Sequence, residues 1–231
     1  MLRRLPIIPL LLLLSLALFA GCGEDDDTIA SGWYPTGNTA TDFFPLNEGA
    51  VWMLTSHTNG ELDYVRIDSV AGQVEISGQQ AVRVVSRCVD PEGAELSSDT
   101  IYYCQNLSTV LEYDPLTDGW NLLPVFSQYS TSTEGDTIWS ETRFVQGVVE
   151  EDILMLNSRE GSLLTAAGPF LHCYVVDESS TTTLPQAGIF SHGWGQRWYA
   201  PEVGFVYRQY RTASAGDTTV LAWELQSVRF P

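Results

Sequence analysis

The chain contains no lysine, because all 11 of its basic residues are arginines, and these face 29 aspartates and glutamates. The absence of lysine excludes a lysine nucleophile, a Schiff base and the lysine of a phosphate-binding P-loop. A formal charge of −18 argues against a basic face that binds nucleic acid or anionic lipid head groups. We therefore expect no nucleic-acid partner.

Several catalytic signatures are also missing. The sequence has no Gly-x-Ser-x-Gly motif of the serine hydrolases and no glycine pattern of a nucleotide-binding loop. Its three histidines, His57, His172 and His192, do not have the spacing of a helix-borne zinc pair, and no Cys-x-x-Cys is present. We predict no metal, no cofactor and a protein that is not an enzyme.

The N-terminal segment has the parts of an export signal. A basic start, Arg3-Arg4, precedes an apolar run over Leu5–Ala20, and the small residue Gly21 stands before Cys22. A transmembrane helix is the alternative interpretation, but spanning a bilayer takes about 20 unbroken apolar residues. Two early prolines, which remove helix hydrogen-bond donors, interrupt this run. Residues 1–21 are therefore predicted to be a cleaved signal peptide.

The five residues Leu18-Phe19-Ala20-Gly21-Cys22 resemble the lipobox of bacterial lipoproteins, although Phe19 stands where leucine is usual. The resemblance implies a diacylglycerol on the sulfur of Cys22, which becomes the first residue of the mature chain. Two or more acyl chains anchor a protein stably, whereas one does so only marginally. The expected location is the bacterial cell envelope, at the periplasmic face of the outer membrane or the cell surface, and the expected partner is that membrane.

Residues 22–40 are predicted to form an acidic, flexible tether. Four consecutive acids, Glu24–Asp27, are followed by a stretch rich in glycine, threonine and serine that cannot bury a core. A calcium site is the sharper alternative, but the spaced ligands and central glycine of a calcium loop are absent. Without the signal, 9 basic residues remain against 29 acidic ones, a formal charge of −20.

Residues 41–231 are predicted to form a single all-β domain. Short runs of β-branched and aromatic residues alternate with turn residues about every ten positions. Asn59-Gly60 is the clearest hairpin signal, since both residues tolerate the positive φ of a type I′ turn. Val148–Ser158 fits a helix as well as a strand, residues 120–127 fit a strand, and Gly193-Trp194-Gly195 fits a loop. We expect an antiparallel meander curled into a barrel or half-barrel.

Three cysteines remain after Cys22, and an oxidising compartment would allow two of them to pair. Cys88 and Cys104 end two neighbouring strand candidates, so a hairpin could bring them together. We predict a Cys88–Cys104 disulfide and a free, buried Cys173, although connectivity cannot be deduced from sequence.

Three stretches resemble a group of bacterial lipoproteins and secreted β-proteins to which no activity is assigned. Phe43-Phe44-Pro45-Leu46 with Gly49 and Trp52 is similar to an opening motif, and Ala167–Phe170 to a middle one. Trp198–Val206 is similar to a closing Tyr-Ala-Pro-Gly-Val-Gly-x-Val motif, in which Glu202 stands at the position of the first glycine. The resemblance implies an all-β envelope protein and carries no catalytic residue.

Two groups of residues are candidates for function. Trp194, Trp198 and Tyr199 belong to a dense aromatic cluster with Phe205, Tyr207 and Tyr210, which fits a ligand platform for a sugar or apolar molecule but fits core packing better. Carboxylates at Glu150-Glu151-Asp152, or at Asp114 and Asp118, could pair for glycoside hydrolysis. The leading hypothesis is a non-enzymatic binding or interaction module for an envelope protein or an apolar small molecule. The alternative is an envelope glycan hydrolase.

Overall fold

The computed structural model describes residues 37–231 except 146, 185, 187, 188 and 215. The predicted signal peptide, Cys22 and most of the predicted tether therefore lie outside the described residues. The last four residues of the predicted tether, 37–40, are described, and Ala40 among them is fully buried. Within the described residues, no helix is long and apolar enough to cross a bilayer.

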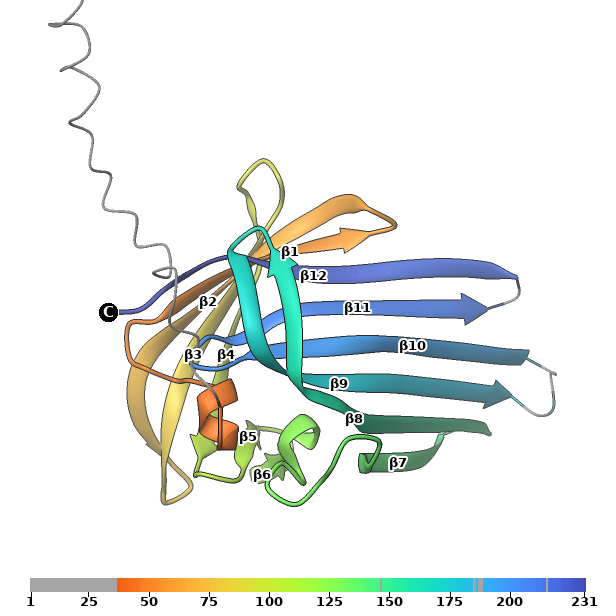
Figure 1. Cartoon of the computed structure of the whole chain (residues 1–231), viewed down its shortest axis with the longest axis horizontal. Coiled ribbons are helices and arrows are strands. Elements are labelled where there is room, and N and C mark those ends of the chain that lie inside the picture. The colour runs from red at the N-terminus through yellow and green to blue at the C-terminus, as the bar shows by residue number, and fades with distance from the viewer. Residues whose placement is uncertain (1–36, 146, 185, 187–188, 215) are drawn as a thin grey trace, which may run out of the picture. The chain divides into compact units, whose positions relative to one another are not determined.

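Twelve strands form one antiparallel sheet (Figure 1), which confirms the predicted all-β class. They are β1 (Val51–Thr58), β2 (Glu61–Ile76), β3 (Gln79–Val89), β4 (Glu95–Gln105), β5 (Val110–Asp114), β6 (Gly119–Leu122), β7 (Thr137–Val145), β8 (Val148–Thr165), β9 (Gly168–Leu184), β10 (Ile189–Ala200), β11 (Gly204–Ser214) and β12 (Asp217–Arg229). Two 3-10 turns, η1 (Ala40–Phe43) and η2 (Pro124–Phe126), are the helical elements described.

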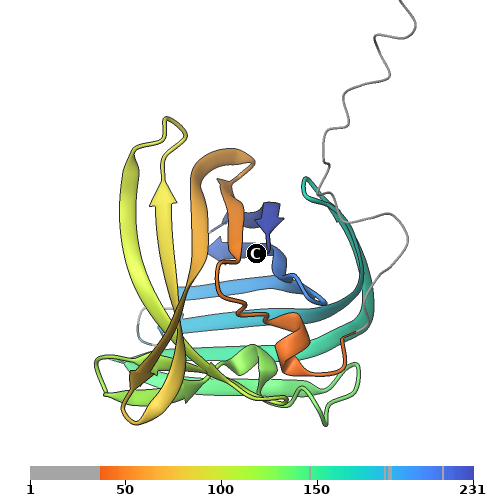
Figure 2. The same ribbon diagram turned by 90° about the vertical axis from the view of Figure 1, so that its left-hand side faces the viewer.

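The first and last strands meet in the middle of the sheet. The order is β6-β5-β4-β3-β2-β1-β12-β11-β10-β9-β8-β7, so two six-strand meanders join along the β1–β12 pair. The sheet curls without closing: seen end-on, β3 and β4 rise on one side and the β8–β9 hairpin on the other (Figure 2). The prediction of a curled meander is confirmed in this open form.

Local turn chemistry sets the registers of the hairpins. Asn59 and Gly60 have φ values of 51° and 89° and join β1 to β2, as predicted. The φ of Gly204 is 93°, and this glycine opens β11 just after the Ala200–Val203 turn. Both turns require a positive φ, and asparagine and glycine are the residues that adopt it at the lowest energetic cost.

Side chains alternate between an inner and an outer face of the curled sheet. The inner face holds Trp52, Leu54, Val84, Val206 and Leu225, all buried. The segment around η1 covers the sheet at one end, where the Trp52 indole donates to the carbonyl of Val203 over 2.6 Å. The largest fully buried rings are those of Phe43, Phe126 and Tyr174, and the Tyr174 ring contacts the other two in this core.

The β8–β9 hairpin bends over part of the outer face (Figure 1). Register shifts near Ser158 and Gly161 bend β8, and the Ala167 amide donates to the carbonyl of Leu225 on β12 over 3.3 Å. Gly161 lies against Trp198 and Val175, where a Cβ would come within 2.9 and 2.4 Å of their side chains. The hairpin and β10 therefore enclose a small second core.

Three local predictions are decided by the structure. Val148–Ser158 is strand, within β8, and not helix. Residues 120–127 are strand only as far as Leu122, because Pro124 begins the 3-10 turn η2. The prediction of a loop at Gly193-Trp194-Gly195 is wrong, since these residues lie in the interior of β10. Glycine occurs inside a strand where a side chain or the backbone of the adjacent strand fills the space that its own side chain would need.

Candidate functional site

The inner face contains a cavity of about 350 Å³, which we call the inner pocket. It lies between the residues that follow η1 and the inner face of strands from both meanders. Its lining comprises Phe44, Pro45, Leu46, Trp52, Leu54, Tyr64, Arg66, Asp68, Val84, Tyr103, Leu123, Arg197, Tyr199, Gly204, Phe205, Arg208 and Trp223. The pocket thus combines aromatic and aliphatic walls with three guanidinium groups.

Two of these arginines share one buried carboxylate. Arg208 donates to Glu178 through Nε, over 2.5 Å to Oε1, and through Nη2, over 2.9 Å to Oε2. Arg197 donates to Oε2 of Glu178 from Nε over 2.8 Å, and its Nη2 lies 2.7 Å from the same oxygen. The Glu178 side chain is only 5% exposed. These charge-assisted bonds fix both guanidinium groups on the inner face.

Sheet register explains how these side chains meet. Glu178 is on β9 and stands opposite Gly195 of β10, while Arg197 of β10 stands opposite Arg208 of β11. Because Gly195 has no side chain, the Glu178 carboxylate can extend across β10 toward β11. A Cβ at Gly195 would lie 2.0 Å from the carbonyl oxygen of Gln209. The backbone of β11 therefore requires glycine at this position.

The guanidinium group of Arg208 forms cation–π contacts with two aromatic rings. Its guanidinium carbon lies 5.0 Å from the ring centroid of Tyr210 and 5.0 Å from that of Trp223. The Trp223 indole in turn donates to the Tyr64 hydroxyl over 3.3 Å. Cation–π contacts of this kind favour the charged guanidinium at a partly desolvated position. Arg208 is thus the best positioned of the three arginines.

The third arginine comes from the other meander. Arg66 on β2 donates from Nε to the Asp68 carboxylate over 2.9 Å, and both side chains are on the inner face. Burial acts to lower the pKa of Arg66, but Asp68 outweighs this and keeps that pKa above its ordinary value. Arg66 remains charged, and its side chain is 38% exposed. The pocket therefore draws on residues from both sides of the β1–β12 junction.

Three arginines are concentrated in one pocket of a strongly acidic chain. Three of the nine arginines that follow the predicted signal line it, and Asp68 and Glu178 form ion pairs with them. A third carboxylate, Glu112, stands opposite Tyr103 in the sheet register and interacts electrostatically with Arg66, so the formal charges balance. In the reduced dielectric of a partly enclosed pocket, a guanidinium group attracts an anion more strongly than it would in water.

The structure separates the three residues predicted as a ligand platform. Tyr199 faces the inner pocket and is buried. Trp198 lies on the outer face, half-buried beneath the β8–β9 hairpin. Trp194, also on the outer face, is 38% exposed and lies beyond that hairpin's cover. Successive strand residues point to opposite faces, so the three rings form no common platform.

The structure does not contain the predicted Cys88–Cys104 disulfide. All three described cysteines are free, and Cys173 is buried, as predicted. The β3–β4 hairpin exists, but its register places Cys88 opposite Ser97. Cys104 is seven residues further along β4, a displacement of about 23 Å at the usual rise per residue. A disulfide needs Cα atoms within about 7 Å of each other.

The carboxylates predicted for glycoside hydrolysis do not meet in a described pocket. Asp114 and Asp118 lie in the exposed β5–β6 turn, where hydrogen bonds from the Leu116 amide and the Tyr113 hydroxyl lower their respective pKa values. Glu150 and Asp152 each form an ion pair with Arg143, at 3.5 and 2.7 Å. The lowered pKa values of Asp114 and Asp118 favour their ionised forms, whereas the general acid of this reaction must be protonated.

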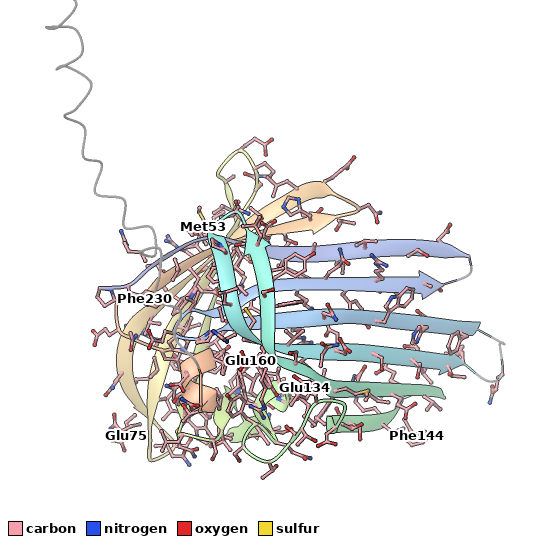
Figure 3. All side chains as sticks on the ribbon, viewed as in Figure 1. Met53, Glu75, Glu134, Phe144, Glu160 and Phe230 are labelled. Atoms are coloured by element: carbon pink, nitrogen blue, oxygen red, sulfur yellow. The ribbon has the colours of Figure 1, made fainter. Side chains whose placement is uncertain are left out.

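The histidines form no metal centre in the part of the chain that the structure describes. His172 forms an ion pair with Glu160. Figure 3 labels Glu160, which lies where β8 bends. His192 stacks between Phe190 and Trp194.

Reasoning from the sequence missed the residues that make the inner pocket charged. Arg66, Arg197, Arg208 and Glu178 were not among the candidates, because they lie on four different strands and form no motif in the sequence. A signal was nevertheless present: Arg197 and Arg208 occupy positions of the same parity as core residues on their strands. A charged residue on a core-facing position of a strand indicates a buried ion pair or a binding site.

Neither a family model nor a curated protein matches the chain. Its fold is similar to two solved structures. One is a "putative lipoprotein" from Parabacteroides distasonis, 19% identical with a TM-score of 0.53, and the match covers 81% of this chain and 98% of that one. The other is a "putative exported protein with YmcC-like fold" from Bacteroides fragilis, 16% identical with a TM-score of 0.53, covering 80% and 97%. At these identities, the likeness shows a shared fold.

Proposed function

We propose that this protein is a lipid-anchored protein of the bacterial envelope that binds an amphiphilic ligand with an anionic head group in the inner pocket. Residues 1–21 act as the export signal, Cys22 carries the lipid, and residues 22–36 serve as the tether, which ends before η1 because Ala40 belongs to the core. The lipobox-like Leu18–Cys22 supports the anchor. The two proteins of similar fold, one described as a lipoprotein and the other as an exported protein, agree with it.

The observation that carries the ligand proposal is the group of three arginines in one pocket. Guanidinium groups present fixed, paired donors that match carboxylate and phosphate oxygens. Arg197 and Arg208 are already held in place by Glu178, so binding an anion costs little side-chain entropy. The charged donors of these guanidinium groups supply the attraction.

The remaining walls of the pocket favour an apolar body on the same ligand. Phe44, Leu46 and Leu123 come from the segments outside the regular strands, and Trp52 and Phe205 from the sheet. Small-molecule sites are mostly apolar with a few placed polar groups. A cavity of about 350 Å³ holds a short chain or one ring system, so a longer ligand would extend out of the pocket.

The ligand proposal is tested with a dansyl-labelled undecanoic acid and its methyl ester, which differ only in the anionic group. We expect the acid to bind at least tenfold more tightly than the ester. In Arg66→Gln, which lies outside the Glu178 cluster, this difference should shrink to less than threefold. Arg87→Gln, an exposed arginine on β3, is the matched control and should keep it. Equal binding of acid and ester by the parent protein would refute the proposal.

The anchor is tested separately in cells fed a clickable fatty acid. The parent protein should incorporate the label and fractionate with membranes, whereas Cys22→Ser should remain unlabelled and uncleaved or soluble. Equal labelling of the two proteins would remove Cys22 as the anchor and leave the pocket proposal untouched.

A further inference from the structure

A second hollow lies on the outer face of the sheet, opposite the inner pocket. This outer groove has a volume of about 450 Å³ and is bordered by β8 to β11. Its lining comprises Ile153, Met155, Asp177, Glu178, Ser179, Trp194, Gly195, Gln196, Tyr207, Gln209 and Arg211. The carboxylate of Glu178 belongs to the inner cluster, and none of these residues lines the inner pocket. The two hollows are therefore separate sites on one sheet.

A row of stacked rings ends at the groove. Phe190, His192 and Trp194 alternate along β10 and so point to the same outer face. The first two ring centroids are 6.3 Å apart at 9°, and the second two are 5.3 Å apart at 17°. His192 covers one face of the Trp194 ring, and Trp194 lines the groove together with Gln196. Stacking thus fixes a flat, 38% exposed indole at the groove's end.

Planar polar groups lie beside this indole. Asp177 accepts from the side-chain amides of Asn157 and Gln196, each over 2.8 Å. On the adjoining strand, Arg211 donates to the Gln209 side-chain carbonyl over 3.2 Å. Each of these groups has two or more hydrogen-bonding atoms, and its neighbour fixes its plane. Such a row presents paired donors and acceptors across the groove at little entropic cost.

This combination of groups matches a sugar ring better than other ligands. A pyranose has a face of C–H groups that packs on an aromatic ring and a rim of hydroxyls that pairs with amide, carboxylate and guanidinium groups. An alkyl chain would remove water from the Asp177 carboxylate and the Arg211 guanidinium and add no hydrogen bond to either, which is unfavourable. A peptide cannot add as a strand here, because β9, β10 and β11 are paired along both edges.

We propose that the outer groove is a saccharide-binding site in which Trp194 stacks on the sugar and Asp177, Gln196, Gln209 and Arg211 bind its hydroxyls. The carboxylate of Asp177 and the guanidinium of Arg211 balance each other, so the ligand is a neutral sugar. The proposal is independent of the inner pocket. An envelope protein carrying it would hold a glycan on one face of the sheet and an amphiphile on the other.

The test uses the mature protein with chitotetraose, cellotetraose and maltotetraose at millimolar concentration, read by tryptophan fluorescence and by saturation-transfer NMR. We expect at least one of the three to bind. Trp194→Ala should weaken that binding about tenfold or more, and Gln209→Ala should weaken it severalfold. Phe144→Ala removes a 78% exposed ring near the end of β7 (Figure 3) and should leave binding unchanged.

Thermal melts accompany each variant, so that lost binding is not confused with lost folding. Arg66→Gln, which tests the inner pocket, should bind the saccharide like the parent protein. The inference is overturned if no saccharide binds the folded parent protein, or if Trp194→Ala binds as tightly as the parent. It is also overturned if sodium dodecanoate, and none of the sugars, changes fluorescence in a way that depends on Trp194.

Discussion

Glu178 and Arg208 lie on strands that are not neighbours, yet two hydrogen bonds of 2.5 and 2.9 Å join their side chains across β10. A sheet normally brings together side chains on adjacent strands. Here, the absence of a side chain at Gly195 opens a path over the intervening strand. Three strands are thereby linked through one carboxylate, and the guanidinium groups of the inner pocket are fixed by the sheet itself.

Glu178→Gln should destabilise the protein by about 2 kcal/mol, because two partly buried guanidinium groups lose their anionic partner. Urea unfolding would measure this. Glu95→Gln, an exposed carboxylate at the start of β4, is the control and should be neutral. Added phosphate should recover part of the loss in Glu178→Gln, since an anion beside the two guanidinium groups restores the lost negative charge. A variant as stable as the parent would show that the cluster contributes nothing net.

Gly195→Ala should cost about 3 kcal/mol or more, because a methyl group cannot fit 2.0 Å from the Gln209 carbonyl oxygen without displacing β11. Gly119→Ala is the matched change, since its Cβ would meet Thr117 Oγ1 at 3.3 Å and needs only a small adjustment. Thermal melting of the two variants should therefore differ by many degrees. Equal melting temperatures would mean that β10 and β11 move apart easily.

Trp198 and Trp194 lie on the same strand and the same face, but their contacts differ. Trp198→Ala should cost about 3 kcal/mol, because it leaves a cavity between β10 and the β8–β9 hairpin. Trp194→Ala should change stability by less than about 0.5 kcal/mol, as is usual at an exposed position. Chemical denaturation of both variants tests this contrast, and a reversed order would contradict the cover over Trp198.

Burial raises the pKa of the Cys173 thiol to about 12. At pH 8 this thiol is neutral and enclosed, so iodoacetamide should modify the half-buried Cys88 and Cys104 and leave Cys173 unmodified until the protein unfolds. Peptide mapping by mass spectrometry locates the label. Modification of Cys173 at the rate of the other two would contradict its burial.

The same shift predicts a loss of stability in alkali. The unfolded thiol ionises near pH 9, while the folded one stays protonated to about pH 12. The contribution of Cys173 is therefore fully present below pH 9 and is lost as the pH rises toward 12. Burial also raises the pKa of Tyr103 and Tyr174, so their contributions fall in the same direction. Urea midpoints measured between pH 8 and pH 11 should decline steadily.

Glu202 has a φ of 61°, in the left-handed region that disfavours side chains. Glu202→Gly should cause no loss and a gain of up to about 1 kcal/mol, because relief of backbone strain offsets the added freedom of the unfolded chain. Glu202→Val should lose about 1 kcal/mol or more, since β-branching is poorly tolerated there. Calorimetry that ranks valine above glycine would contradict the turn geometry.

The turns and the overall class of this fold could be predicted because they depend on local chemistry. Asn59-Gly60 needs only its own backbone preference to form the first hairpin, and the positive φ of Glu202 marks another turn that depends on local backbone geometry. Gly193 and Gly195 were misassigned to a loop because their cause is not local. The space that side chains at Gly193 and Gly195 would need is occupied by the Tyr210 ring and by the backbone of Gln209, both on the neighbouring strand β11.

The candidate sites were less predictable, for a related reason. Charges at Arg66, Glu178 and Arg208 are far apart in sequence, and only the registers of β2, β9 and β11 place them in one group. The same registers separate Cys88 from Cys104, because β3 pairs with β4 at a register that sets Cys88 opposite Ser97. Sequence periodicity assigns a residue to one face of the sheet, but the register of strand pairing decides which residues of the adjacent strands lie beside it.

The meeting of β1 with β12 has a consequence for folding kinetics. Each six-strand meander is built from sequence neighbours and can form early, whereas pairing Val51 with Arg229 closes most of the chain into one loop. Contacts of such high contact order form slowly, since the loop entropy is lost before they stabilise the structure. Arg66 and Arg208 come from opposite sides of this pair. We therefore expect the inner pocket to be assembled late in folding, so that a ligand that binds there would report completion of the sheet.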